Sequence, residues 1–464
     1  MSKNPIDFLF NPASVAVVGA SPEAGKLSGI IMESIKKGGF KGSIFPVNPK
    51  YDSINGLKCY PAISAIESEV HLAVFAVPAR PAVGLLKEAV GKIKCAIIIS
   101  GGFGEINEAG KSFEKDLKDI VRRFGIRVVG PNCLGVFDTS SGLDTFFIPH
   151  ERLKRPPKGP LSIISQSGSF AVTAMDEMAR EGIGVARIVS YGNRVDVNES
   201  DCLEFLADDP ATGVVALYLE SIEDGRRFIE AAKRCTAKKP VLAVKVGKMD
   251  AGASAALSHT GAMTGRYEVY RAAFKKSGVT EVSGYEELIE GCRALSLQRP
   301  SRGNRVMIIT DGGGMGVNIA DAASAAGLVV QPLDESIREE LSGSFPPFFV
   351  ASNPMDLTGS VTDELYAEAL EKAMSKDFYD LAIVAALWGP PGLTDGLVQL
   401  LSEKSAMSGK PVVVCSPGGS FARERDALFK KWGIPVYTTP EATVRAASVL
   451  TRIGSTRETQ PDNG

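Results

Sequence analysis

One local pattern occurs three times along the chain: a short apolar run, a turn rich in Gly and Ser, and a segment with helical periodicity. The apolar runs begin near Ser14, Leu161 and Arg305, about 145 residues apart. A continuous apolar run of this length predicts a strand that is buried on both faces. A strand followed by a helix is the opening of a parallel βαβ unit, so the sequence predicts three such openings.

Further apolar runs alternate with helical segments in each third of the chain. We therefore predict an α/β protein with three consecutive doubly wound, Rossmann- or flavodoxin-like domains and mainly parallel sheets. The helix after the third glycine-rich turn is predicted to cover residues 317–326. The other predicted strands cover residues 70–77, 95–100, 214–219, 241–246, 381–387 and 412–415.

Two polar joints separate the three openings. Residues 149–160 are basic and proline-rich and residues 298–304 combine Pro, Gly and Arg, so both joints are expected to be exposed linkers. The polar tail 454–464 is expected to be disordered. The joints place the domains at residues 1–150, 151–300 and 301–464.

Composition excludes several classes of protein. The 464 residues include 52 Lys and Arg against 54 Asp and Glu, a net charge of −2 that disfavours a nucleic-acid binder. Seven scattered cysteines without a C-x-x-C pair and only three histidines exclude a disulfide framework, a zinc module and a His-rich metal site. No apolar run approaches the roughly 18 residues of a membrane span, and the N-terminus lacks a signal-peptide layout. We expect a soluble, cytoplasmic protein that binds no membrane and holds no metal.

The first glycine turn, residues 19–26, follows a predicted strand and could hold phosphate on backbone N–H groups. It is neither a P-loop nor a G-x-G-x-x-G fingerprint, because the required Gly and Ser or Thr residues are missing. Asn48 and Lys50 follow the second strand, where an NAD site would have an acidic residue. These residues suit the phosphorylated ribose of coenzyme A or NADP, and the alternative is a glycine turn used only for packing.

The three histidines lie in different settings. His71 precedes an apolar strand and is expected to pack there, and His150 lies in the first joint and is expected to be solvated. His259 lies among small residues in the stretch 253–265, where an imidazole could be exposed and mobile. Because imidazole is a nucleophile toward phosphorus, His259 is either a site of covalent phosphorylation or an ordinary surface histidine.

Three more turns, at residues 75–78, 100–105 and 130–135, each end a predicted strand. Together with the first glycine turn they resemble the CoA-binding domain of the succinyl-CoA synthetase superfamily, and most closely the α subunits of the ADP-forming acyl-CoA synthetases. The resemblance implies that CoA is held by Gly19, Ser21, Lys26, Asn48, Lys50, Val77, Pro78, Ser100, Gly101, Asn132 and Cys133.

The run Ser258 to Gly261 resembles the phosphohistidine loop of the same superfamily. The resemblance implies that His259 accepts a phosphoryl group and that Glu220, at the end of a predicted strand, orients the histidine. Residues 192–201 also resemble a family stretch near this site, and the alternative is a polar loop that caps a helix at Asp196 or Asn198. The implied phosphate-binding residues are Ser165, Gln166, Ser167, Gly168, Ser169, Gly312, Gly313 and Gly314.

The resemblance covers residues 5 to 450, and none of the three predicted domains looks like an ATP-grasp module. It therefore implies a separate β subunit that carries this module and holds ADP or ATP with Mg²⁺, in an α₂β₂ assembly. The implied reaction converts acyl-CoA, ADP and phosphate into a carboxylic acid, CoA and ATP, through an acyl phosphate and a phosphohistidine. Two other functions stay open: a Rossmann-type NAD(P)-dependent oxidoreductase and a non-catalytic CoA-sensing protein.

Overall fold

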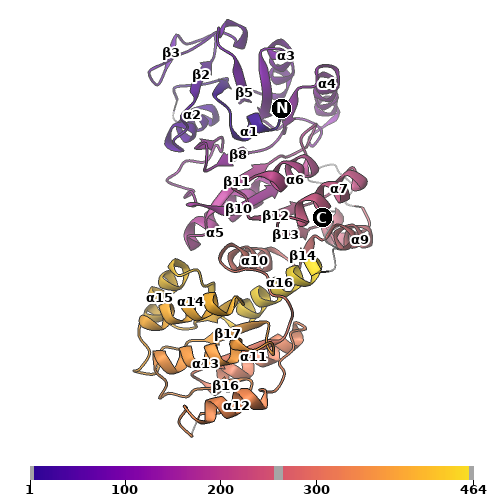
Figure 1. The fold of residues 1–464 in the computed structure, drawn as a ribbon. Helices are drawn as coiled ribbons and strands as arrows, with labels where there is room; N and C mark the ends of the chain where they lie inside the picture. The colour runs from indigo at the N-terminus through magenta and orange to yellow at the C-terminus, as the bar shows by residue number, and fades with distance from the viewer. Residues whose placement is uncertain (1–4, 24, 255–264, 348, 459–464) are drawn as a thin grey trace. The chain divides into compact units, whose positions relative to one another are not determined.

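The computed structural model describes residues 5–23, 25–254, 265–347 and 349–458. The chain forms two compact units, Met1–Val282 and Ser283–Gly464 (Figure 1). The first unit contains two large sheets and the second contains one, and neighbouring strands are mainly parallel in all three. The predicted α/β class with three mainly parallel sheets is therefore confirmed.

The first sheet has the strand order β2-β1-β5-β6-β7, and all of its strands are parallel. Its helices cover both faces: Val17 of β1 packs in a buried cluster with Ile31 of α2, and Ala16 packs in another with Leu86 of α3. Its elements are α1 (Asp7–Phe10), β1 (Ser14–Val18), α2 (Leu27–Lys37), β2 (Ser43–Val47), the hairpin β3 (Ser53–Ile54) and β4 (Leu57–Lys58), β5 (Val70–Phe75), α3 (Ala79–Ala89), β6 (Ile93–Ile98), α4 (Glu108–Phe124) and β7 (Arg127–Val129).

The second sheet has the order β14-β13-β12-β10-β11-β8-β9, and only β8 and β9 run antiparallel to their neighbours. The chain leaves the first sheet after β7, so that β8 pairs with β11 of the second sheet. Its elements are β8 (Gly135–Asp138), β9 (Leu143–Asp144), β10 (Lys158–Ser165), α5 (Gly168–Glu181), β11 (Val185–Ser190), α6 (Glu199–Asp208), β12 (Val214–Leu219), α7 (Gly225–Thr236), β13 (Val241–Lys245), α9 (Tyr267–Ser277) and β14 (Thr280–Val282).

The joint at residues 149–160 packs against the unit instead of running free through solvent. Asp144 is fully buried, and its carboxylate is paired with Arg155 Nε at 2.7 Å and His150 Nε2 at 3.1 Å. The expectation that His150 is solvated is wrong, because a buried carboxylate requires cationic or hydrogen-bonding partners. His71 packs as expected: its ring contacts Phe8 edge-on, and its Nδ1 accepts the N–H of Ala13 at 2.9 Å.

The sheet of the second unit has the order β16-β15-β17-β18-β19 and is parallel throughout. Its elements are α10 (Tyr285–Leu297), β15 (Val306–Thr310), α11 (Gly313–Ala325), α12 (Glu335–Ser342), β16 (Met355–Asp356), α13 (Asp363–Ser375), β17 (Leu381–Ala385), α14 (Gly396–Ser408), β18 (Val412–Cys415), α15 (Ser420–Lys431), β19 (Val436–Tyr437) and α16 (Pro440–Glu458).

Two polar segments of this unit are more ordered than predicted. In the joint 298–304, Ser301 is fully buried and the Gln298 amide donates to the carbonyl of Gly433 at 2.6 Å. The tail expected to be disordered from residue 454 continues α16 as far as Glu458. A Cβ at Gly454 would lie 1.6 Å from the Ser301 carbonyl oxygen, so this glycine permits close packing between the joint and α16.

Candidate active site

The first candidate site is a pocket of about 250 Å³ at the carboxyl edge of the first sheet. It lies where the strand order reverses between β1 and β5, the place where doubly wound sheets bind ligands. Four of the predicted CoA-binding residues line it together: Gly19, Asn48, Lys50 and Val77. Most of the remaining lining is apolar, which suits the body of a nucleotide-like ligand.

Two of these residues shape the pocket floor. Gly19 has φ +85°, and a Cβ there would lie 2.5 Å from Cγ1 of Val77, so both conformation and space require glycine. Asn48 donates to the carbonyl of Ala20 at 2.8 Å and accepts the N–H of Lys50 at 3.0 Å. Asn48 therefore ties the loop after β1 to the loop after β2.

Other predicted CoA-binding residues support the loops and do not line this pocket. Ser21 is buried and accepts the N–H of Glu23 at 3.2 Å, while the Lys26 ammonium pairs with Glu23 at 2.6 Å on the surface. Ser100 donates to the carbonyl of Val77 at 2.6 Å and so joins the ends of β5 and β6. Pro78 and Gly101 are likewise not among the described residues that line the pocket.

A larger pocket, of about 730 Å³, lies at the carboxyl edge of the second sheet. The strand order reverses here between β10 and β12, which makes this edge a second expected place for a ligand. Of the predicted residues, those that line it are Gln166, Ser167, Gly168, Ser169 and Glu220 from the second sheet and Asn132 and Cys133 from the first. The structure thus brings predicted CoA-binding and phosphate-binding residues to one cavity.

The start of α5 forms one wall of this larger pocket. Ser167 is the N-cap and accepts the N–H of Phe170 at 3.3 Å. The fully buried Ser165 donates from Oγ to the Ser167 carbonyl at 2.6 Å and shapes the turn from beneath. The first-turn N–H groups and the helix dipole make such a helix start suitable for holding an anion.

Glu220 follows directly after β12 and is only 6% exposed. The side-chain oxygen of Gln166 accepts the backbone N–H of Glu220 at 2.8 Å and that of Ser221 at 3.1 Å. Gln166 therefore fixes the turn that carries Glu220 against the start of α5. The predicted nucleophile His259 lies outside the described residues.

Asn132 and Cys133 enter the larger pocket from the loop after β7. Cys133 is buried, its Sγ lies 3.3 Å from the carbonyl oxygen of Ile98, and burial raises the pKa of its thiol to about 12. This thiol is therefore protonated at neutral pH and is not a nucleophile. Asn132 has φ +58° and its amide lies 3.3 Å from Oδ1 of Asn193, which connects it to the second sheet.

The sequence reasoning did not single out Glu114 and Glu223, which also line this pocket. Both interpretations of residues 192–201 hold in part: Asn193 and Arg194 line the pocket, and Asn198 caps α6 in a capping box with Asp201. Which side chains of residues 192–201 line the pocket depends on the conformation of the loop after β11, which a local sequence pattern does not report.

In the second unit, Gly312 to Gly314 begin α11 as predicted, although the helix starts at Gly313 and not at residue 317. A Cβ at Gly312 would lie 2.5 Å from Cδ1 of Leu387, and one at Gly313 would lie 2.7 Å from Oδ2 of Asp356, so a side chain at either position would require the neighbouring side chain to shift. The sequence reasoning did not single out Asp311 as a site residue. Its side chain is buried and accepts the N–H of Leu387 at 3.0 Å, and burial raises the pKa of its carboxyl to about 6.

Among the residues that the structure describes, no group of three or more His, Cys, Asp or Glu side chains is placed to hold a metal ion. None of the described helices combines the length and the apolar character needed to cross a membrane.

Three sequence families match the chain, and together they indicate the class of CoA-dependent ligases. A CoA-binding domain family matches residues 13–139, and a succinyl-CoA ligase-like flavodoxin domain family matches residues 158–295. A ligase-CoA domain family matches residues 306–452.

Relatives that match almost the whole chain narrow this class of ligases to one family. The α subunit of acetate–CoA ligase (ADP-forming) I of Pyrococcus furiosus is 39% identical, and the match covers 96% of this chain and 97% of the relative. The 4-hydroxybutyrate–CoA ligase (ADP-forming) of Nitrosopumilus maritimus is 32% identical over 99% of this chain and 66% of the relative. The dinucleotide-forming acetyl-coenzyme A synthetase 1 of Ca. Korarchaeum cryptofilum, solved with phosphate and ADP, superposes with a TM-score of 0.91 at 34% identity, covering 98% of this chain and 97% of the other. The chain belongs to the α subunits of the ADP-forming acetate–CoA ligases, a family of enzymes.

Proposed function

We propose that this chain, with a partner subunit, interconverts acyl-CoA, ADP and phosphate with a carboxylic acid, CoA and ATP. In the first step an oxygen of inorganic phosphate attacks the thioester carbonyl, the C–S bond breaks, and an acyl phosphate and CoA thiol result. In the second step a ring nitrogen of His259 attacks phosphorus, the bond to the acyl oxygen breaks, and the carboxylate leaves. The phosphoryl group on His259 then passes to ADP.

The observation that carries this proposal is the shared pocket of about 730 Å³. It unites Asn132 and Cys133, on the side predicted to bind CoA, with the start of α5 and Glu220. We assign the α5 start, from Ser165 to Ser169, to phosphate and to the charge that develops during transfer. We assign Glu220 to the ring of His259, because a carboxylate on one ring nitrogen fixes the tautomer and leaves the other nitrogen free to attack.

For CoA we propose the smaller pocket at the first sheet, with Gly19, Asn48, Lys50 and Val77 in contact and Ser21, Lys26, Pro78, Ser100 and Gly101 supporting the loops. Gly312 to Gly314 at the start of α11 are proposed to hold the phosphoryl group on the nucleotide side. We propose three domains, at residues 1–150, 151–300 and 301–464. They serve CoA binding, phosphoryl transfer and the nucleotide side, in that order.

The printed name "subunit alpha" of the Pyrococcus relative supports a partner subunit for this chain. We propose that the partner is a β subunit with an ATP-grasp domain that holds ADP or ATP and Mg²⁺, in an α₂β₂ assembly. We also propose a cytoplasmic location, which the seven buried cysteine thiols, none of them in a disulfide, support because such thiols persist in a reducing compartment. The comparisons do not favour the oxidoreductase or the CoA-sensing protein.

The test compares wild type with His259→Ala, each assembled with the partner subunit. Wild type incubated with ³²P-labelled acetyl phosphate should acquire an acid-labile, base-stable label and should form ATP from ADP. His259→Ala should bind CoA like wild type yet acquire no label and form no ATP. An unlabelled wild type that binds CoA would refute the proposed transfer and favour a sensor, and a fully active His259→Ala would refute the role of the histidine.

A further inference from the structure

Arg194 has an unusual position in the larger pocket. It lies in the β11–α6 loop (residues 191–198), its backbone has φ +50°, and its side chain lines the pocket although the residue is only 6% exposed. The left-handed conformation is unfavourable for a residue with a long side chain and is adopted most readily by glycine. A strained position that keeps a buried, charged side chain in a pocket indicates that the side chain itself is used.

The guanidinium group of Arg194 binds Ser221, in the turn that carries Glu220. It donates from one terminal nitrogen to the backbone carbonyl of Ser221 and from the other to the Ser221 hydroxyl at 2.8 Å. Its Nε lies 3.4 Å from a carboxylate oxygen of Glu223. These three contacts use the planar fork of the guanidinium, a geometry that a lysine ammonium cannot reproduce.

Gln166 holds the same turn from the other side. It accepts the N–H groups of both Glu220 and Ser221, while Arg194 binds the Ser221 carbonyl and hydroxyl. Side chains from two other segments therefore bind both the backbone N–H and the backbone C=O of Ser221. These bonds hold the turn in a single conformation. Tyr270 of α9 adds a third contact, in which its hydroxyl oxygen accepts the N–H of Ile222 at 3.2 Å.

The neighbouring residue of the same loop binds the first sheet. The amide of Asn193 donates to Glu105 at 2.6 Å, and Glu105 in turn accepts the N–H groups of Gly102 and Phe103 in the loop after β6. The N–H of Asn193 also donates to the carbonyl of Pro131 at 2.9 Å, next to Asn132. Two adjacent residues thus connect the predicted CoA side of the pocket to the turn that carries Glu220.

We propose that Arg194 is a positioning residue, which holds the Glu220 turn in register with the CoA side of the pocket for phosphoryl transfer. The inference rests on the proposed function, because it presupposes that Glu220 serves the transfer. Arg194 acts through Ser221, and the step it supports is the one already written: a P–N bond forms at His259 while the bond from phosphorus to the acyl oxygen breaks.

The test uses the complete assembly and the variant Arg194→Gly, which removes the guanidinium and suits the left-handed backbone. We expect the single-turnover rate of ³²P labelling from acetyl phosphate to fall about 100-fold, since displacement of a group that orients a reactant has large effects on rate. The dissociation constant for CoA should stay close to wild type. The unfolding midpoint should fall, because the buried Ser221 carbonyl loses its donor and the buried Glu199 loses the guanidinium 4.0 Å away. Arg194→Lys should lose about 10-fold, because it keeps the charge but not the fork.

Chemical rescue separates positioning from a structural role. Arg194→Gly leaves space at the pocket wall, so millimolar guanidinium ion should restore the labelling rate several-fold, while wild type should not respond. Asn55→Gly, another left-handed position (φ +51°) in the β3–β4 hairpin, is the control for relief of backbone strain and should label like wild type.

Arg194→Gly that labels within about threefold of wild type would overturn the inference, and so would a rate loss matched by an equal loss in CoA affinity. If Arg194→Gly does not fold, Ser221→Ala with Arg194→Lys repeats the comparison, and unchanged labelling in both would overturn it as well. In all these cases a labelled wild type leaves the proposed function intact, whereas an unlabelled wild type refutes both.

Discussion

The side-chain oxygen of Gln166 accepts the backbone N–H of Glu220 at 2.8 Å and thereby joins the residue after β10 to the residue after β12. The second unit repeats this relationship, because Asp311 after β15 accepts the N–H of Leu387, two residues beyond β17. In both sheets the bond crosses the place where the strand order reverses. At the carboxyl edge, a neutral amide therefore makes this connection in the second sheet, and a titratable carboxyl makes it in the sheet of the second unit.

We predict that Gln166→Met disturbs both stability and activity. Two buried N–H groups, those of Glu220 and Ser221, would lose their acceptor, and each unsatisfied group costs about 1–3 kcal/mol. We expect the free energy of unfolding in urea to fall by about 2 kcal/mol and ATP formation to fall at least 10-fold as the turn loosens. Gln399→Met, on the exposed face of α14, should change neither quantity. Normal activity in Gln166→Met would show that the turn needs no such support.

Asp311→Asn tests the titratable version of the same relationship. Burial raises the pKa of Asp311 to about 6, so between pH 4 and pH 6, roughly, the folded state binds a proton that the unfolded state releases. This contribution to stability is present at low pH and is lost as the pH rises through about 6. Asparagine keeps an acceptor for Leu387 without a charge. The free energy of unfolding of Asp311→Asn, measured in urea relative to that of wild type, should rise by about 2 kcal/mol from pH 4.5 to pH 7.5. A pH-independent difference would contradict the raised pKa.

The sequence placed the sheet edges well, because a strand buried on both faces is visible as an unbroken apolar run. The strands 214–219 and 412–415 have the predicted bounds, and the others end one or two residues before their predicted ends. Glu220 and the start of α5 could be assigned to one edge without coordinates, since the carboxyl ends of parallel strands meet there. That inference needs only strand direction, which the βαβ pattern provides.

Side-chain direction within the loops could not be predicted. Lys26 and Asn48 both follow strands of the first sheet, yet Lys26 pairs with Glu23 on the surface while Asn48 lines the pocket. Arg194 was hidden in a polar stretch because its burial depends on a left-handed backbone and on a turn from another strand. The Arg194–Ser221 contact connects residues 27 positions apart, and no local periodicity reports such a contact.

We predict that Gly19→Ala narrows the pocket that we propose for CoA at the first sheet. Gly19 and Gly39 have nearly equal backbone angles, φ +85° and +83°, but a Cβ at Gly19 would lie 2.5 Å from Val77 and one at Gly39 would meet nothing within 4 Å. Gly39→Ala therefore measures the backbone strain alone, about 1 kcal/mol. Gly19→Ala should lose clearly more stability and weaken CoA binding at least 10-fold by calorimetric titration. Unchanged CoA affinity would move the CoA site away from this pocket.

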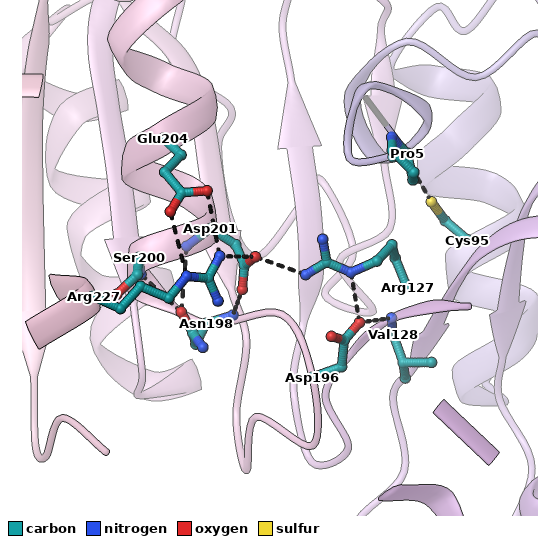
Figure 2. A network of polar contacts seen from close by, with 10 residues as sticks. All are labelled: Pro5, Cys95, Arg127, Val128, Asp196, Asn198, Ser200, Asp201, Glu204 and Arg227. Atoms are coloured by element: carbon teal, nitrogen blue, oxygen red, sulfur yellow. Dashed lines mark hydrogen bonds and ion pairs between the residues drawn. The ribbon is translucent and has the colours of Figure 1, made fainter. Parts of the chain in front are cut away.

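The last prediction concerns the charged network that joins the edge of the first sheet to α6 and α7 (Figure 2). Arg127 of β7 pairs with Asp196 at 2.9 Å and with Asp201 at 2.8 Å, and Asp201 also pairs with Arg227 at 2.6 Å. The side chain of Asp201 is only 3% exposed, whereas that of Arg227 is 39% exposed. Loss of the buried member should therefore be more harmful than loss of the exposed one.

Asp201→Asn removes the buried negative charge that Arg127 and Arg227 share and should lower the free energy of unfolding by about 2 kcal/mol, because the charge-assisted hydrogen bonds to both arginines are weakened while Arg127 keeps Asp196. Arg227→Ala should lower it by about 1 kcal/mol or less, since Asp201 keeps Arg127. Arg234→Ala, in the exposed pair with Asp208, is the control and should have an effect near zero. Urea unfolding at low and high salt checks the ranking: the Asp201 effect should persist in salt that screens the surface pair. Equal losses for Asp201→Asn and Arg234→Ala would mean that the network does not stabilise the connection between the two sheets.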